Sequence, residues 1–484
     1  MDVLEFIAIN LFNEVSILIG AITAIGLLLQ RKPVEDVVGG AIRATIGIII
    51  LFIGVDVFVA GLASFQAIVA SAVGLDPPSS NNTLDEFLGT HGSDVALVIT
   101  LGFVVHLVLV RVLKTRYVYL TGHLLFWMAV VITASLVQVF GELDRWQLVL
   151  VGSAVAGCYW TVQPLFIAPM MRRVISSDDW GYGHTSSSVA WLSGRLAPLV
   201  GDPQKHDVEQ VRLPKRLSFF KDVTVSTAVV IGLIMLVGLA FADGGVVDEQ
   251  AAAYDPEINP WVWGVVAALR FAAGIAILLY GVRMFLAEIV PAFTGISEKA
   301  IPGSRPALDA PTIFPVAPSA VMLGFVSTTA TFLVLMGVFA AAGWFVLVPP
   351  MIMLFFVGAG AAVFGNAFGG WRGATLAGVV TGISLAFGQW LGWSLLSDTA
   401  PELATLADPD WYLVILLLLG LGELFSGFGD NAVLLVGLVV VVIFGVWTWL
   451  LKRLQRRDDE TLAESEAEPE PEPEPSDEEA SRER

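Results

Sequence analysis

The sequence predicts an all-α polytopic membrane protein with about eleven transmembrane helices, and three observations lead to this prediction. The chain has 484 residues, of which 56% are hydrophobic and only 15% charged. A soluble protein of this length would carry more charge and fewer apolar residues. Many stretches approach the roughly 20 apolar residues that a helix needs to cross a bilayer. One apolar segment also occurs twice, which indicates a duplicated membrane unit.

The expected spans follow one another along most of the chain. They cover roughly residues 13–30, 37–60, 93–112, 118–140, 147–170, 223–241, 259–289, 319–341, 346–366, 374–396 and 431–451. Residues 411–429 are also apolar, but a twelfth span would place the basic run KRLQRR on the wrong side of the membrane. We therefore interpret them as a surface or re-entrant helix.

Basic residues lie in alternate loops, which predicts the orientation of the chain. The loops after the first, third, fifth, seventh, ninth and last spans carry lysine and arginine, whereas the loops between them are acidic or neutral. Cytoplasmic loops are the ones enriched in these residues. We expect a multi-pass protein of the cytoplasmic membrane with its N-terminus outside and its C-terminus inside. The start, MDVLEF, lacks the basic region of a cleavable signal peptide.

The duplicated segment covers residues 41–60 and 268–287, and half of its positions are identical. Arg43 aligns with Arg270, and the two glycines of one copy with the two of the other. Four expected spans separate the copies, so they would cross the membrane in opposite directions. Such an inverted repeat is typical of transporters, whose substrate site lies near the midplane between broken helices.

The expected domains follow from this repeat. Residues 1–222 form the first half with a long cytoplasmic loop, and residues 223–456 form the second half with the final span. Residues 457–484 are rich in Glu-Pro and have few apolar residues. Such a composition cannot bury a core, so we expect a disordered acidic cytoplasmic tail.

Two charged residues stand at equivalent positions of the two repeat copies, Asp56 in the first and Arg283 in the second. A charge within a membrane span is costly and is usually paired or functional. The two side chains could form an ion pair between the halves, or they could belong to a substrate site. The sequence leaves both open.

Other polar residues stand where the backbone is expected to be irregular. His123 and His184 each follow a glycine, which lets the chain turn, and each could bond a substrate hydroxyl or a neighbouring carbonyl. Asp309 lies in a stretch with five prolines, which no continuous helix accommodates. Non-helical backbone at membrane depth must be buried or line a cavity. We expect a re-entrant hairpin with Asp309 at its tip, and similar irregular backbone around Asn366.

The sequence gives no sign of an enzyme of its own. It contains no Walker sequence, no GxSxG, no HExxH and no Cys/His metal spacing, so no catalytic residue, metal site or cofactor is expected. The single cysteine, Cys158, lies in an apolar run and is expected to be a small core residue. Nothing in the sequence indicates a nucleic acid as partner.

Seven stretches resemble one known family, the ascorbate-specific membrane component (enzyme IIC) of the bacterial phosphoenolpyruvate-dependent phosphotransferase system. They are RKPVEDVVGGAIRATIG, YLTGHLLF, GYGHTSSSVAWLSGRLAPLVG, KDVTVSTAVV, GVRMFLAEIVPAFTGISEKAIPG, ALDAPTIFPVAPSAV and FGNAFGGWRG. Together they extend over roughly residues 1–450.

The resemblance implies a homodimer in which each subunit has a gate domain and a mobile core domain that moves like an elevator. It implies transport of a sugar that is phosphorylated by a separate cytosolic IIB protein, which a IIA component supplies in turn. Since Cys158 is embedded in a span, this chain has no credible phosphocarrier cysteine of its own.

Carried over by position, His123, His184 and Asp309 match polar residues of the family's sugar site. Three positions depart from the family's pattern: Val55 replaces a serine, and Trp127 and Thr185 each replace a glutamine. Each change removes hydrogen-bonding capacity, which a site built for hydroxyl groups needs. Trp127 could stack on a sugar ring or could simply pack.

The sequence therefore supports two functions on one scaffold. The first is uptake of L-ascorbate or a related sugar acid or polyol, coupled to phosphorylation by IIB. The second is an uncoupled or ion-coupled secondary carrier. A purely structural or receptor protein would not need broken helices with polar residues in both halves.

Overall fold

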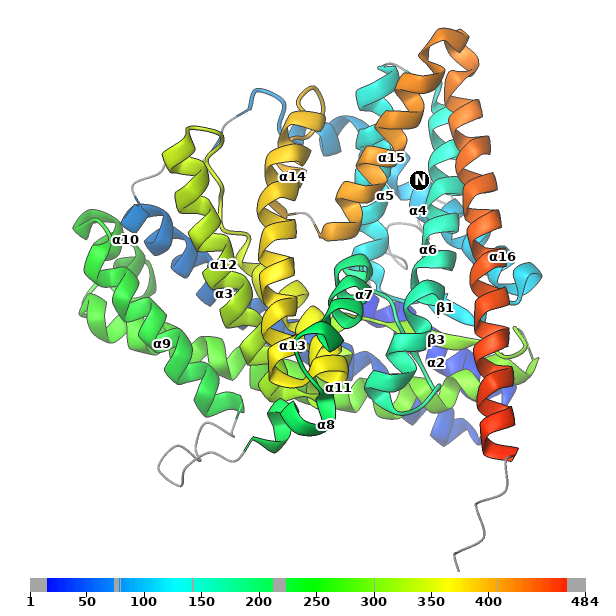
Figure 1. Ribbon diagram of the computed structural model, residues 1–484, viewed down its shortest axis with the longest axis horizontal. Helices are drawn as coiled ribbons and strands as arrows, with labels where there is room; N and C mark the ends of the chain where they lie inside the picture. Colours follow the sequence, from blue (N-terminus) through cyan, green and yellow to red (C-terminus); the bar gives the residue numbers. More distant parts are fainter. Residues whose placement is uncertain are drawn as a thin grey trace, which may run out of the picture.

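The computed structural model describes residues 15–73, 78, 80–141, 143–211, 223–299, 301–406 and 408–467. Long helices account for most of them (Figure 1). The helices of the first half and the loop after it are α2 (Val15–Leu29), α3 (Val34–Val73), α4 (Leu84–Leu113), α5 (Gly122–Phe140), α6 (Arg145–Ile175), α7 (Ser187–Leu196) and α8 (Pro203–His206), with short 3₁₀ turns η2 (Ala197–Leu199) and η3 (Val208–Gln210).

The second half contains α9 (Val223–Phe241), α10 (Gly244–Tyr254), α11 (Pro260–Lys299), α12 (Pro318–Ala342), α13 (Met351–Leu395), α14 (Leu403–Leu406), α15 (Pro409–Phe425) and α16 (Ala432–Ala467), with η5 (Ala310–Val316) and η6 (Ser426–Asn431). Nine helices of the described ranges are long and apolar enough to cross a membrane, and α2 and α9 contain shorter apolar helices. The expected all-α polytopic fold is thereby confirmed. The count of eleven spans stays a prediction.

The two copies of the repeat lie in α3 and α11, which pack against each other in antiparallel directions. A methyl group added at Gly54 would lie 2.7 Å from the carbonyl oxygen of Gly274, and one added at Gly281 would lie 2.7 Å from that of Gly47. The two contacts are equivalent in the repeat, because Gly54 aligns with Gly281 and Gly47 aligns with Gly274. The helices therefore cross about an approximate two-fold axis, as an inverted repeat requires, and glycine allows their backbones to touch.

The observed bounds of several elements differ from those expected from the sequence. The segment expected as a span at 118–140 is a short strand followed by α5, which begins only at Gly122. The segments expected at 346–366 and 374–396 are the two arms of α13, which reverses at Gly370 (φ 63°, ψ −156°). Helix α16 continues to Ala467, beyond the expected start of the tail at 457. Residues 468–484 lie outside the described ranges.

A small parallel sheet lies buried among the helices. It consists of β1 (Tyr117–Tyr119), β2 (Gly181–Tyr182) and β3 (Arg305–Leu308), in the order β1-β3-β2. In the register of the sheet, Ala307 of β3 pairs with Tyr119 of β1 on one side and with Gly181 of β2 on the other. Strand β3 and η5 replace the hairpin that was expected around Asp309. The sheet satisfies the backbone groups that a non-helical segment would otherwise leave unpaired inside the membrane.

His106 of α4 supports the first strand of this sheet. Its ring is fully buried; Nε2 accepts a hydrogen bond from the Tyr119 N–H (2.9 Å), and Nδ1 lies 2.9 Å from the Thr161 hydroxyl. Because the Tyr119 N–H must donate to Nε2, the ring proton is on Nδ1. His106 is therefore a structural residue that fixes β1 to α4 and α6.

Two segments enter the bundle from opposite ends and meet in its middle. One follows α6, forms β2 and returns as α7 to Gly201, which contacts Gly369 beside the reversal of α13. The second segment begins at Asp398, whose carboxylate accepts a hydrogen bond from Gln138 at the end of α5. It reaches Asp410, whose carboxylate accepts a hydrogen bond from Tyr159 in the middle of α6.

Helix α15 then leads back toward the end of α5, where Gly422 contacts Val139. Residues 409–429 also satisfy the length and composition of a span, but this course agrees with the re-entrant alternative predicted for 411–429. Figure 1 shows α15 rising from the middle of the molecule to its upper edge, from which α16 descends.

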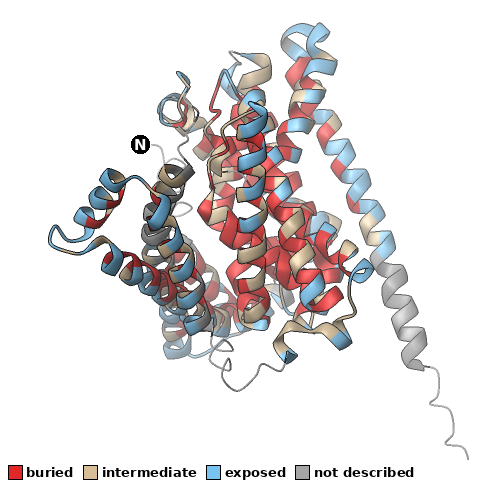
Figure 2. Ribbon diagram, turned by 60° about the vertical axis from the view of Figure 1, so that its left-hand side comes forward, coloured by how far each residue is buried: buried red, intermediate tan, exposed pale blue. Residues whose placement is uncertain are grey.

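The apolar core has two parts, and buried residues concentrate in the centre of the molecule (Figure 2). One large part is built mainly on α9 to α13, with residues of α3, α6 and α7, and the other mainly on α4, α5, α6, α15 and α16. Phe52 of α3 and Trp180 of the segment before β2 pack against both parts. The outer faces of α3, α11 and α16 expose large apolar side chains, as a lipid-embedded surface does.

Candidate functional site

Three predicted site residues lie within four residues of the carboxyl ends of the three strands. His123 comes after β1, His184 after β2 and Asp309 after β3. The carboxyl ends of parallel strands meet at one edge of a sheet. There His123 Nε2 lies 3.7 Å from Asp309 Oδ2, and His184 Nε2 lies 3.8 Å from Asp309 Oδ1. One carboxylate thus faces two imidazole rings.

These side chains line a cavity of about 300 Å³ between the two parts of the apolar core. Leu51 and Phe52 of α3, Leu124 and Trp127 of α5, and Phe356 of α13 contribute apolar walls. A small number of polar groups in a mostly apolar cavity is typical of a site for a small molecule. The remaining lining residues are Pro311, Ile352, Met353, Leu406, Asp408 and Trp411.

Hydrogen bonds fix the orientation and proton position of the buried His184. Its Nδ1 accepts from the Ser186 N–H (3.1 Å) and lies 2.8 Å from the Ser186 hydroxyl. Since the backbone N–H can only donate, the ring proton of neutral His184 is on Nε2. That N–H is directed toward Asp309 and the cavity, where it can donate to a ligand oxygen.

Asp408 is a lining residue that the sequence did not single out. It occupies the N-cap position of α15, but its side chain makes no cap hydrogen bond. Instead, Oδ2 accepts a hydrogen bond from the Thr185 hydroxyl, while Oδ1 is buried without a hydrogen-bond partner among the described residues. A buried carboxylate oxygen left in this way is costly, and a ligand hydroxyl that reached it would supply the missing hydrogen bond.

Asp410 joins the start of α15 to α6 and to the segment that leads into α7. Its carboxylate accepts from the Tyr159 hydroxyl (2.8 Å) and the Ser188 N–H (2.9 Å), and its own N–H donates to the Thr185 carbonyl (2.9 Å). From the sequence alone, Asp408 and Asp410 are expected in an acidic loop on the outer side of the membrane. The sequence ADPDW could have indicated a helix start, because aspartate is common at the N-cap and proline at the next position.

Two tryptophans, Trp127 and Trp411, are among the aromatic residues that line the cavity. The rings of Trp127 and Trp411 are 6.1 Å apart and tilted by 33°. The indole N–H of Trp411 is buried without a hydrogen-bond partner within the described ranges. The cavity therefore combines an aromatic surface with a donor at Trp411 and an acceptor at Asp408, all of which a hydroxylated ring could use.

The other predicted site residues are placed differently. The Thr185 hydroxyl is directed to Asp408, and Thr185 is not among the residues that line the cavity. The side chain of Val55 lies outside the described part of the structure. Asn366 was expected in irregular backbone but lies in an arm of α13, where it bonds Asp207 and Val208 of the long loop.

Asp56 and Arg283 are both exposed, and among the described residues no ion pair joins them. The contacts of Gly54 with Leu278 and of Gly47 with Phe285 place Asp56 opposite residue 276. Arg283 is seven residues further along α11, about 10 Å away along the axis. Among the described residues, Arg43 and Glu288 form an ion pair between these helices, with 2.5 Å between Nε and Oε1.

The geometry suits the binding of a small hydroxylated molecule. Within the described ranges no group of three or more His, Cys, Asp or Glu side chains is arranged to hold a metal ion. The polar groups of the cavity are instead spread around it, with acceptors at Asp309 and Asp408 and donors at His184 and Trp411. Such a distribution can bond several hydroxyl groups of one ligand.

Comparison with known proteins agrees with this architecture. Residues 10–410 match the family described as "PTS system sugar-specific permease component". Among curated proteins, the chain is similar to the "Ascorbate-specific PTS system EIIC component" of Mycoplasma pneumoniae (strain ATCC 29342 / M129 / Subtype 1), with 27% identity over 417 residues. The match covers 76% of this chain and 63% of that protein. A membrane-embedded fold, a polar cavity in its middle and a family match over most of its length place this chain in the PTS system sugar-specific permease component family.

Proposed function

We propose that this permease component carries L-ascorbate or a related sugar acid or polyol across the cytoplasmic membrane. The observation that supports this function best is the convergence of His123, His184, Asp309 and Asp408 on one cavity of about 300 Å³. The name of the similar Mycoplasma protein supports ascorbate as the first ligand to test. The Trp127 and Trp411 rings offer a surface for one face of the ligand ring.

The proposed coupling follows from the family. A separate cytosolic IIB protein, supplied by IIA, phosphorylates the sugar that reaches the cytoplasmic side, so this chain is a transport subunit rather than an enzyme by itself. Cys158 is buried in α6, which agrees with a phosphocarrier cysteine on the partner.

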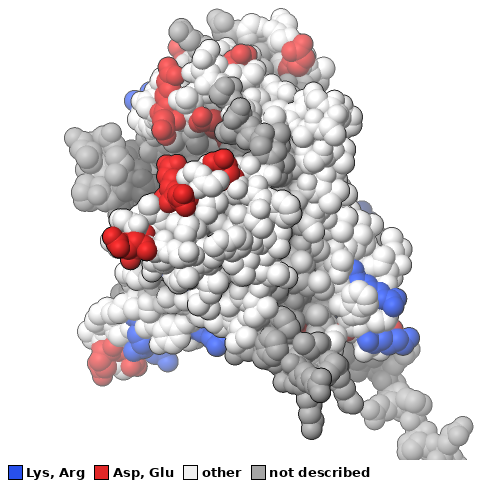
Figure 3. Space-filling view, turned by 90° about the vertical axis from the view of Figure 1, so that its left-hand side faces the viewer, with Lys and Arg blue, Asp and Glu red and all other residues white. Residues whose placement is uncertain are grey.

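We propose the orientation with the C-terminus in the cytoplasm. Lys114, Arg116, Arg172 and Lys452 gather at the end of the bundle where α6 ends, while Asp398 lies at the opposite end. In Figure 3 most acidic residues of the visible face lie toward the top and the basic residues toward the bottom. This distribution fits the enrichment of basic residues on the cytoplasmic side.

We propose a homodimer formed through α3, with a gate domain at the interface and a core domain that moves like an elevator. The exposed face of α3 is an apolar stripe of Ile42, Ile46, Ile49 and Ile53, and the exposed Asp56 continues it. A carboxylate facing lipid is costly, so this face is better covered by protein. A second copy of the chain would supply that cover.

Calorimetry on the purified protein tests the ligand. L-Ascorbate is titrated first, followed by sugar acids, pentitols and hexoses. Saturable ascorbate binding that is lost in Asp309→Ala supports the proposed site and substrate. Binding of another polyol without ascorbate binding would move the specificity but retain the site. Unaltered affinity in Asp309→Ala would remove Asp309 from it.

The alternative is an uncoupled or ion-coupled secondary carrier on the same scaffold, which one observation favours. Asp408 and Asp410 are buried carboxylates at the meeting point of two re-entrant segments, where a proton or cation could accompany the sugar. Uptake by proteoliposomes without IIB decides between the functions. Sugar accumulation driven by an ion gradient alone would favour the alternative, and its absence favours coupling to phosphorylation.

A further inference from the structure

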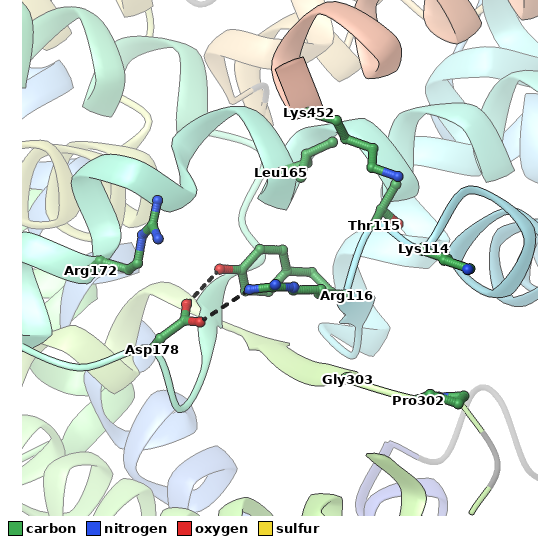
Figure 4. Close-up of a pocket in the computed structure, with 10 residues that line it drawn as sticks. Lys114, Thr115, Arg116, Leu165, Arg172, Asp178, Pro302, Gly303 and Lys452 are labelled. Carbon is green, nitrogen blue, oxygen red and sulfur yellow. Dashed lines mark hydrogen bonds and ion pairs between the residues drawn. The ribbon is translucent and has the colours of Figure 1, made fainter. Parts of the chain in front are cut away.

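A second cavity lies at the opposite ends of the same three strands. It measures about 440 Å³ and shares no lining residue with the central cavity. Its lining comes from β1, α6, α16 and the segments that precede β1, β2 and β3 (Figure 4). Strand β3 begins at Arg305, beside this cavity, and ends before Asp309. Four residues of strand span about 13 Å, which is therefore the separation along the sheet between the two cavities.

Basic side chains dominate the lining of this cavity. Lys114, Arg116, Arg172 and Lys452 lie around it, with Asp178 as the acidic lining residue. The four cations come from three segments that are far apart in the sequence, since Lys114 and Arg116 share one. Positive charges that served only to orient the chain in the membrane could remain dispersed on separate loops. Their convergence in one cavity concentrates positive potential there.

The carboxylate of Asp178 is already shared by several neighbours. Its Oδ1 accepts from the Tyr117 hydroxyl (3.0 Å), and its Oδ2 lies 3.8 Å from Arg116 Nη1 and 3.9 Å from Arg305 Nε. Burial raises the pKa of Tyr117, so its hydroxyl remains protonated and donates. Among the described residues that line the cavity, one carboxylate thus stands beside four basic side chains.

The backbone turns sharply where two helices end beside the cavity. Lys114 (φ 52°) and Ser176 (φ 53°) are the left-handed C-cap residues of α4 and α6, which is a common way for a helix to end. Arg116 also has a positive φ of 75°, which is uncommon for a residue with a side chain. These turns bring Lys114, Arg116 and Asp178 to the cavity.

We propose that this cavity binds a phosphate monoester through Arg116 and Arg172. Guanidinium groups bond phosphate oxygens in pairs, and Figure 4 shows both guanidinium groups beside the open centre of the cavity. The proposal rests on the proposed function in one respect: with the C-terminus inside, the cavity faces the cytoplasm, where the phosphorylated sugar is formed. An anionic lipid headgroup carries the same phosphate chemistry.

The test uses the full-length protein in nanodiscs of neutral phosphatidylcholine. Glycerol 3-phosphate is titrated by calorimetry, with glycerol as the uncharged control. We expect saturable binding of glycerol 3-phosphate alone, weakened by at least about tenfold in Arg116→Gln and in Arg172→Gln, because each loses a charge-assisted hydrogen bond. Arg173→Gln is the matched control: it removes a charge from the same helix but lies outside the lining, so its affinity should stay unchanged.

Asp178→Asn changes the affinity in the opposite direction. Removing the acidic lining residue with little change of shape should tighten glycerol 3-phosphate binding severalfold. This variant also keeps the proposal falsifiable if an arginine variant does not fold. The absence of saturable binding to the wild-type chain would overturn the proposal, as would equal losses in Arg172→Gln and Arg173→Gln or weaker binding in Asp178→Asn.

Two further arms separate the sources and the sites. Nanodiscs that contain phosphatidic acid identify a lipid headgroup as occupant if they displace glycerol 3-phosphate, and a soluble phosphate if they do not; both results support the site. Ascorbate titration of the same variants addresses the central cavity by itself. Ascorbate binding without phosphate binding would refute this second site alone, and phosphate binding without ascorbate binding would refute only the ascorbate assignment.

Discussion

At the scale of single residues, Asp309 is the group on which the central cavity depends most. It accepts the Ala310 N–H at 2.7 Å and faces both His123 and His184. The first bond fixes the carboxylate at the end of β3, and its position in turn places a negative charge between two imidazole rings. The position of Asp309 at the end of β3 therefore determines where its carboxylate lies in the polar wall of the cavity.

We expect Asp309→Asn to weaken sugar binding by at least about tenfold, because the amide offers one acceptor instead of two and no charge. Asp85→Asn, on the exposed first turn of α4, is the matched control and should leave the affinity unchanged. Calorimetry with the ligand found for the wild type measures both. Equal affinities for wild type and Asp309→Asn would contradict the placement of this carboxylate in the site.

Thr185 gives a prediction about stability. Its hydroxyl donates to the buried carboxylate of Asp408, so Thr185→Val leaves that carboxylate without this partner. We expect a loss of about 1–3 kcal/mol in the free energy of unfolding, seen as a lower melting temperature in detergent. Thr185→Ser retains the hydroxyl and should melt close to the wild type. A Val variant as stable as the Ser variant would show that this bond is not needed.

At the scale of elements, glycine residues allow the backbones of α3 and α11 to cross in close contact. The backbones touch at Gly54 and at its symmetry equivalent Gly281, and this close approach joins the two halves of the chain. Side chains at these points would push the helices apart. The crossing therefore limits which residues the repeat can carry.

Gly54→Leu should lower the melting temperature and reduce the yield of folded protein, since a Cβ there would lie 2.4 Å from the Leu278 nitrogen. Gly281→Leu should have a similar effect, because its Cβ would lie 2.4 Å from the Leu51 nitrogen. Gly89→Leu in α4, where nothing lies within 4 Å, is the control. If all three variants melt alike, close packing at the crossing does not stabilise the fold.

Most helices could be predicted from sequence, whereas the sheet and half of the site could not. Apolar runs are a local property of the sequence, so most spans could be predicted from them. The repeat could be detected because its arginine and glycine residues align directly. Strands of two to four residues have no detectable periodicity, and Tyr119 stood inside an apolar run assigned to a span. Asp408 and Trp411 reach the cavity because α15 begins beside Tyr159 of α6, which is a tertiary effect.

At the scale of the whole molecule, the exposed surface gives a prediction about assembly. Ile53 on α3 is 48% exposed and Ile443 on α16 is 39% exposed, so a single chain presents both to its surroundings. Asp56 distinguishes the two faces, because it continues the stripe of α3. Only the α3 face is proposed to meet a second copy.

Ile53→Glu should convert the purified protein to a monomer, because the proposed interface would bury an unpaired charge on each copy. Ile443→Glu places the same charge on a face proposed to contact lipid or detergent and should remain dimeric. Light scattering coupled to size exclusion measures the mass of each. A monomeric wild type, or a dimer that survives Ile53→Glu, would contradict the interface on α3.

The strand order has a consequence for biosynthesis. Strand β3 lies between β1 and β2, yet it is the last of the three to leave the ribosome. When residues 117–119 and 181–182 have been inserted, the strand that separates them has not been made, and more than a hundred residues must follow before Arg305 emerges. The nascent first half must therefore wait with unpaired backbone groups, sheltered by water, the insertion machinery or a chaperone. Both cavities therefore depend on β3 and on residues made later still, with Asp408 and Trp411 in the central cavity and Lys452 in the second, so a chain truncated before Leu308 could not acquire either one.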